Sequence, residues 1–100
     1  MSELPNFVIH PAAAQDTVQA ARWYAKHSAR AAAAFREEIS RAIEQVRANP
    51  QRWLAGPHGT RRLLMRTFPF ALVYRELPGA IQLLAVAHGH RRPGYWKDRL

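Results

Sequence analysis

The chain has no cysteine among its 100 residues, so disulfide bonds and thiolate metal ligands are excluded. No apolar run approaches the roughly 18 residues that cross a membrane. The N-terminal segment MSELPNFVIH has no basic region followed by a long apolar stretch, as an export signal would have. We therefore expect a cytoplasmic protein with no membrane partner, and the length predicts a single domain over residues 1–100.

Acidic residues and lysines are also scarce. Seven Asp and Glu stand against fifteen Lys and Arg, which gives a net charge of +8, and only Lys26 and Lys97 are lysines. The planar guanidinium of arginine can donate two parallel hydrogen bonds, so it suits phosphate and carboxylate groups better than the ammonium of lysine does. The composition therefore indicates a nucleic acid or an acidic protein as the partner, although a coding bias toward arginine and alanine would give the same counts.

Periodicity predicts one strand followed by two helices. A β-prone run covers Leu4–His10, and Pro11 fits the first turn of a helix that continues from Ala12 to about His27. The small or apolar residues at helical spacing in this helix are Ala14, Val18, Ala21 and Ala25. A second helix ends at Asn49-Pro50. Its apolar face is formed by Phe35, Ile39, Ala42, Ile43 and Val46.

The connection between the helices lies within Lys26–Arg30, which is short enough to predict an antiparallel hairpin. The following segment, QRWLAGPHGT, predicts a loop. Three β-prone runs come next, at Arg61–Thr67, Phe70–Glu76 and Ala80–His88. We therefore expect an α+β fold with an N-terminal strand, a helical hairpin and a three-stranded antiparallel meander, the helices packing on one face of the sheet.

Two segments carry a family resemblance, FPFALVYR at residues 68–75 and AHGHRRPGYW at residues 87–96. Together with Asn49-Pro50 and Arg61-Arg62, they resemble the RelE/ParE superfamily of toxins from type II toxin–antitoxin modules, over about residues 9–96. The resemblance implies a small growth-inhibiting toxin that a cognate antitoxin holds inactive in a hetero-oligomer. Members of the superfamily inhibit DNA gyrase, as ParE does, or cleave messenger RNA on the ribosome, as RelE does.

Cleavage of RNA through its own 2′-hydroxyl needs a base, an acid and cations around the phosphate, but no metal or other cofactor. His88 and Tyr95 are the candidate catalytic residues if the protein is a nuclease. The candidate contacts to a phosphate or to another target are Arg61, Arg62, Arg66, Arg91 and Arg92. The lysines of the nuclease members are missing, and arginine cannot replace a lysine base because it stays protonated. The sequence is therefore closer to ParE, with inhibition of gyrase as the favoured activity and a RelE-like messenger RNA endonuclease as the alternative.

Several of these residues also have a packing interpretation. Tyr95 and Trp96 are expected to anchor the tail on the sheet, because aromatic side chains bury large apolar areas. His88 is as compatible with a plain exposed position as with a functional one. Arg61 and Arg62 point to opposite faces of one strand, so they cannot both serve one pocket.

An acidic, partly disordered antitoxin segment that folds on binding is the expected partner of this basic domain. Its candidate contacts are Trp23 and Tyr24 of the helical hairpin and the free edge of the sheet. Trp23 and Trp53 also have an interpretation as core residues, which is the favoured one for both. A different nucleic-acid-binding module would explain the charge as well, but no stacking platform or helix-turn-helix pattern supports it.

Overall fold

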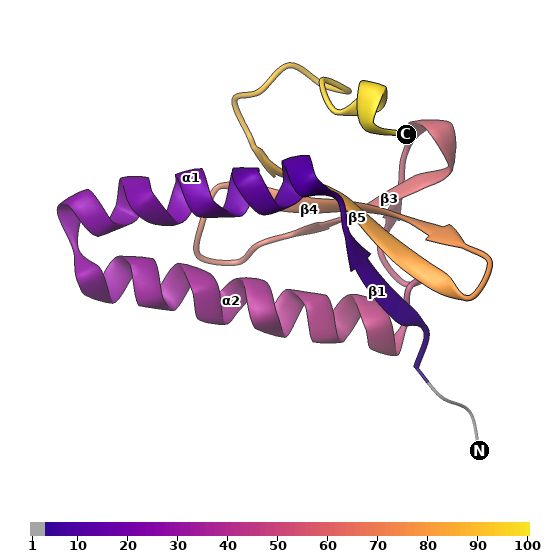
Figure 1. Ribbon diagram of the computed structural model, residues 1–100, viewed down its shortest axis with the longest axis horizontal. Helices are drawn as coiled ribbons and strands as arrows, with labels where there is room; N and C mark the ends of the chain where they lie inside the picture. Colours follow the sequence, from indigo (N-terminus) through magenta and orange to yellow (C-terminus); the bar gives the residue numbers. More distant parts are fainter. Residues whose placement is uncertain (1–3) are drawn as a thin grey trace.

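A helical hairpin covers one face of a five-stranded sheet (Figure 1). The computed structural model describes residues 4–100. The helices are α1 (Pro11–His27) and α2 (Ala29–Ala48). The strands are β1 (Asn6–Ile9), β2 (Leu54–Ala55), β3 (Thr60–Leu64), β4 (Phe70–Leu77) and β5 (Ala80–His88). The expected α+β class and the packing of both helices on one sheet face are confirmed.

A single residue, Ser28, both ends α1 and begins α2. Its backbone N–H donates to the Tyr24 carbonyl at 2.8 Å, and its hydroxyl accepts from the Ala31 N–H at 3.1 Å. Serine is favoured at this position because its oxygen satisfies one of the free N–H groups in the first turn of a helix. The predicted tight reversal within Lys26–Arg30 is therefore confirmed (Figure 1).

The buried face of α2 was predicted correctly, and that of α1 only in part. The buried residues of α2 are Ala32, Phe35, Ile39, Ala42 and Val46. On α1 the expected stripe is right for Ala21, which is 1% exposed, and wrong for Val18, which is 42% exposed. The buried residues of α1 are Ala13, Ala20 and Ala21. Since alanines lie on several sides of α1, their spacing does not define one face. Tyr24 defines the buried face instead, because its bulky side chain packs against the core with its ring 5.3 Å from that of Phe35.

The sheet has the order β1-β5-β4-β3-β2 and differs from the expected meander at both edges. β1 is shorter than the predicted Leu4–His10 and pairs in parallel with β5. β2 lies inside the segment predicted as a loop, and its two residues pair with Arg61 and Arg62 of β3. A two-residue strand has no periodicity of its own, so only its partner β3 defines it.

The first strand of the meander, β3, ends at Leu64 rather than at the predicted Thr67. Beyond it, the Glu38 carboxylate on α2 accepts hydrogen bonds from the backbone N–H groups of Arg66 at 2.8 Å and Thr67 at 3.2 Å. These N–H groups are satisfied without a strand partner, so the chain is free to turn toward β4. A side chain on α2 therefore fixes where β3 gives way to the turn.

Two apolar clusters lie on opposite faces of the sheet. The larger one fills the space between the helices and the sheet. The smaller one consists of Val73, Leu84, Ala85 and Trp96. Leu84 is an extra residue in β5, because Val73 pairs with Ala85 while Tyr74 pairs with Leu83. This bulge turns two consecutive residues of β5 toward the face that the C-terminal tail covers. Within residues 4–100, neither helix has the length and apolar character needed to span a membrane.

Candidate functional site

The C-terminal tail, residues 89–100, is fixed to the sheet and to α1. Trp96 is 7% exposed and packs in the smaller apolar cluster, as expected of an anchor. The Arg99 guanidinium donates to the Asp16 carboxylate of α1 at 2.7 Å and to the Leu84 carbonyl of β5 at 2.9 Å. The same carboxylate accepts from the Val86 N–H at 3.1 Å. The Asp16–Arg99 ion pair therefore joins the tail, α1 and the edge of β5.

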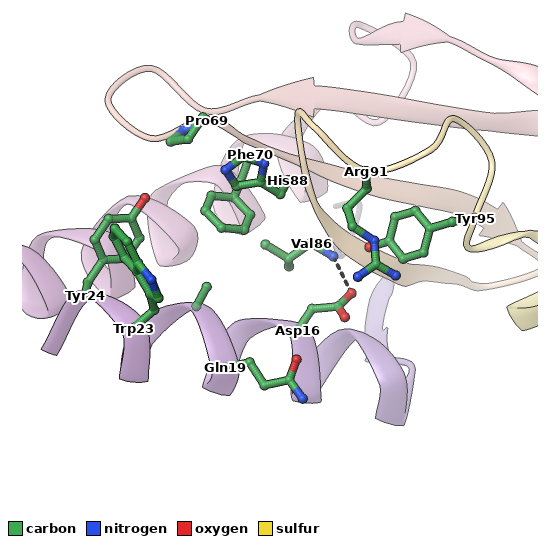
Figure 2. Close-up of a pocket in the computed structure, with 11 residues that line it drawn as sticks. Asp16, Gln19, Trp23, Tyr24, Pro69, Phe70, Val86, His88, Arg91 and Tyr95 are labelled. Atoms are coloured by element: carbon green, nitrogen blue, oxygen red, sulfur yellow. Dashed lines mark hydrogen bonds between the residues drawn. The ribbon is translucent and has the colours of Figure 1, made fainter. Parts of the chain in front are cut away.

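A groove of about 460 Å³ opens between α1, the end of β5 and the tail (Figure 2). β1 pairs with β5 only as far as Leu83, so within the described chain the outer edge of β5 has no strand partner beyond that residue. Arg91 and Tyr95 close the end of the groove that the tail forms (Figure 2). The lining residues are Asp16, Gln19, Ala20, Trp23, Tyr24, Pro69, Phe70, Val86, His88, Arg91 and Tyr95.

Two arginines lie against the ring of Tyr95, which lines this groove. The guanidinium carbon of Arg91 is 4.1 Å from the ring centroid, and that of Arg99 is 5.2 Å from it. Both distances allow cation–π attraction, which holds Arg91 over the ring. Burial, reinforced by the negative charge of Asp16, raises the pKa of the Tyr95 hydroxyl above its ordinary value. Burial thus favours the protonated hydroxyl, which can donate a hydrogen bond.

His88 forms part of the groove wall near Phe70 (Figure 2). Its ring centroid is 5.0 Å from that of Phe70 and 5.1 Å from that of His90, with which it stacks. Its Nδ1 accepts a hydrogen bond from the His90 N–H at 3.0 Å. In the neutral imidazole the proton is therefore on Nε2, which is the nitrogen left to contact a partner.

Trp23 and Tyr24 line the opposite end of the groove from Arg91 (Figure 2). Trp23 is 58% exposed, so the core position favoured by the sequence is wrong for this residue. Tyr24 is partly buried against the core. Neighbouring residues on a helix point in different directions, which lets one ring pack inward and the other stay in water. Trp53, by contrast, is partly buried against the core.

A second cleft, of about 130 Å³, lies on the tail side of the sheet and is lined by Arg62 and Arg92. Arg62 pairs with Val73, a member of the smaller cluster that the tail covers. Arg61 also borders the cleft, but its strand partner Tyr74 belongs to the helix-side core. The predicted alternation of the two arginines along the strand is observed, but both of them line the cleft, so the expectation that they cannot share one pocket is wrong. The Arg61 guanidinium donates to the Trp53 carbonyl at 2.9 Å, so its side chain has a structural partner.

The predicted site residues do not converge on one point. Arg91 shares the groove with His88 and Tyr95, whereas Arg92 lies at the cleft. Arg66 is exposed in the turn between β3 and β4 and lines neither cavity. Adjacent residues of the tail, Arg91 and Arg92, thus belong to different sites.

Asp16 and Arg99 belong to the site although nothing in the sequence predicted them for it. They are 83 residues apart, and only the folded chain brings them together. One signal was present, because Asp16 is the single carboxylate on α1. Across residues 4–100, no group of three or more His, Asp or Glu side chains is arranged to hold a metal ion.

The order of the elements and the basic tail agree with the small toxin of the RelE/ParE superfamily that the sequence resembles. The family model for the ParE toxin of the type II toxin–antitoxin system parDE matches residues 7–93, and the chain belongs to this family. A similar solved structure is described as the chromosomal ParDE TA system from P. aeruginosa. It has a TM-score of 0.74 and 20% sequence identity, over 87% of this chain and 98% of that chain, and this likeness shows the shared fold. No curated protein matches the sequence.

Proposed function

We propose that this ParE-family protein acts in the cytoplasm as an inhibitor of DNA gyrase and that a cognate acidic antitoxin neutralises it in a hetero-oligomer. The observation that carries the proposal is the match of residues 7–93 to the ParE toxin family. Inhibition of gyrase is the activity that the resemblance to ParE implies. The arrangement of the polar residues supports this activity over the nuclease alternative.

An RNA-cleaving site needs a base, an acid and several cations around one phosphate. Here His88 and Tyr95 share the groove with one arginine, Arg91, whereas Arg62 and Arg92 line the cleft on the other side of the sheet. The raised pKa of Tyr95 favours its protonated form, which could serve as the acid of such a site but is a poor base. An inhibitor of gyrase needs a binding surface rather than a set of catalytic residues around one phosphate. Arginines distributed between the groove and the cleft are compatible with such a surface.

The groove is the surface that we propose for the antitoxin. Trp23 lies exposed at one end, Phe70 and Val86 line its middle, and Arg91 stands at the other end. An acidic segment that folds on binding can pack apolar side chains on the rings and pair a carboxylate with Arg91. The net charge of +8 favours the approach of such a segment.

A strand of the antitoxin can also pair with β5, whose outer edge is uncovered by β1 beyond Leu83. The Leu84 carbonyl and the Val86 N–H are already bonded to Arg99 and Asp16. An added strand would therefore begin beyond Val86 unless it displaced the ion pair.

Expression of the protein without an antitoxin tests the proposed function. We expect growth arrest and loss of negative supercoiling in a reporter plasmid, with messenger RNA ends unchanged in primer extension. Coexpression of a small acidic protein encoded beside the gene is expected to restore growth. Codon-positioned RNA cuts with normal supercoiling would establish the nuclease alternative, and growth at the normal rate would contradict a toxic activity.

A further inference from the structure

The cleft on the tail side of the sheet has positive charge and no acidic residue in its lining. Arg62 reaches it from β3 and Arg92 from the tail, two segments that are 30 residues apart in sequence and meet only in the fold. Both side chains are exposed, and within residues 4–100 neither forms an ion pair or a side-chain hydrogen bond. Two free guanidinium groups at one concave site are suited to an oxyanion.

The walls of the cleft are fixed before any ligand binds. On one wall the Thr60 hydroxyl donates to the Pro57 carbonyl, and Thr60 is buried. On the other wall Gly94 has a φ of 73°, a left-handed conformation that lets the tail turn between Arg92 and the buried Trp96. Arg92 is therefore carried on an anchored segment rather than on a loose end. An anchored backbone limits the conformational entropy lost on binding to that of the two exposed arginine side chains.

We infer that this cleft binds a backbone phosphate of duplex DNA, through Arg62 and Arg92. Arginine contacts to phosphates position a protein on a duplex without reading its sequence. The inference rests on the proposed function, because gyrase holds duplex DNA and an inhibitor bound there has such phosphates within reach. The groove shares no lining residue with the cleft, so it stays available to the antitoxin.

The lining of the cleft favours duplex DNA over single-stranded RNA. Proteins that bind single strands stack exposed aromatic rings on the unpaired bases. The aromatic residue of the cleft, Trp96, is 7% exposed and is committed to the apolar cluster with Val73. The cleft therefore offers charge for a phosphate and no ring for a base.

A titration of the purified protein with DNA tests the inference directly. The probe is a fluorescein-labelled duplex of about two helical turns, ~20 bp, followed by anisotropy from about 50 to 200 mM potassium chloride. The double variant Arg62→Ala/Arg92→Ala is expected to bind about tenfold more weakly, and its slope of log K against log salt is expected to be about 1 smaller in magnitude. The matched control is Arg30→Ala/Arg36→Ala, which removes two exposed arginines from α2 and touches neither cavity.

The control variant is expected to keep the slope of the unchanged protein. An equal loss of affinity in both double variants would overturn the inference, because binding would then follow from diffuse surface charge. Tighter binding of a single-stranded RNA probe of equal length, lost in the cleft variant, would also overturn it in favour of RNA. Circular dichroism of each variant verifies that the fold is retained.

This titration contains no gyrase, so the two proposals fail separately. Normal plasmid supercoiling during growth arrest, with DNA binding intact, would contradict gyrase inhibition and leave the phosphate site standing. If the protein inhibits supercoiling but Arg62→Ala/Arg92→Ala binds DNA as tightly as the control variant does, only the phosphate site is contradicted.

Discussion

At the scale of single residues, Arg91 and Arg92 show how neighbours in sequence serve different surfaces. Arg91 lies over the Tyr95 ring in the groove, and Arg92 lines the cleft. We expect Arg91→Ala to weaken antitoxin binding about tenfold, because it removes a charge-assisted contact at the end of the groove. Calorimetric titration with the antitoxin measures the change, with Arg92→Ala as the control that keeps full affinity. Equal weakening by both substitutions would contradict the separation of the two sites.

Tyr74 is a structural residue despite its titratable group. Its hydroxyl donates to the Pro50 carbonyl from a fully buried position, and burial raises its pKa to about 12. Tyr74→Phe leaves that carbonyl without its donor, so we expect a loss of about 1 kcal/mol in the free energy of unfolding, with toxicity unchanged. Urea unfolding measures it, and Tyr24→Phe on the groove is the comparison. A stability equal to that of the unchanged protein would show that this bond contributes nothing.

At the scale of elements, the turn between β3 and β4 depends on one carboxylate of α2. Burial opposes ionisation of Glu38, but hydrogen bonds from Thr67 and Arg66 and the charge of Arg41 outweigh it, so the pKa of Glu38 lies below its ordinary value. A carboxyl whose pKa is lower in the folded state than in the unfolded state stabilises the fold at pH values above its unfolded-state pKa. This contribution is lost as the pH falls through the folded-state pKa.

We therefore expect Glu38→Gln to reduce the loss of stability between neutral pH and about pH 3. Urea unfolding at several pH values measures the dependence. Glu37→Gln, an exposed neighbour on the same helix, is expected to leave the dependence as it was. An acid-induced loss of the same size in Glu38→Gln as in the unchanged protein would contradict the role given to this carboxylate.

The tail is an element whose position depends on the Asp16–Arg99 ion pair, whose side chains are 16% and 17% exposed. Asp16→Asn removes the charge and leaves Arg99 without its counter-ion. We expect a loss of about 2 kcal/mol in stability, as for a hydrogen bond to a charged group, and faster trypsin cleavage within the tail. Asp98→Asn, an exposed change in the tail itself, is the control. Unchanged cleavage in Asp16→Asn would mean that Trp96 alone holds the tail.

Elements with strong periodicity could be predicted from the sequence, and those defined by a distant partner could not. The apolar spacing around Phe35 and Ile39 gave the buried face of α2, and the run Ala80–His88 gave β5. β2 was missed because two exposed residues form it only by pairing with β3. In the site, the alternation of side chains along a strand predicted that Arg62 lies on the opposite face of the sheet from Arg61. No local pattern predicted the contact of Asp16 with Arg99, which is 83 residues away in the tail.

At the scale of the whole molecule, most of the basic side chains form no ion pair within residues 4–100 and can therefore contact other molecules. Among residues 4–100, Arg99 is the one arginine found in an ion pair, while the chain carries a net charge of +8. Such a surface steers acidic proteins and nucleic acids toward it, and added salt screens the effect. One of these arginines, Arg91, lines the groove proposed for the antitoxin, and three others, Arg61, Arg62 and Arg92, line the cleft proposed for a phosphate.

Supercoiling of relaxed plasmid by purified gyrase, with and without this protein, tests the central claim most directly. We predict that the protein inhibits supercoiling, that added antitoxin restores it, and that Arg62→Ala/Arg92→Ala inhibits less than the control Arg30→Ala/Arg36→Ala does. Supercoiling at the full rate with excess folded protein would contradict the account of this chain as a gyrase inhibitor.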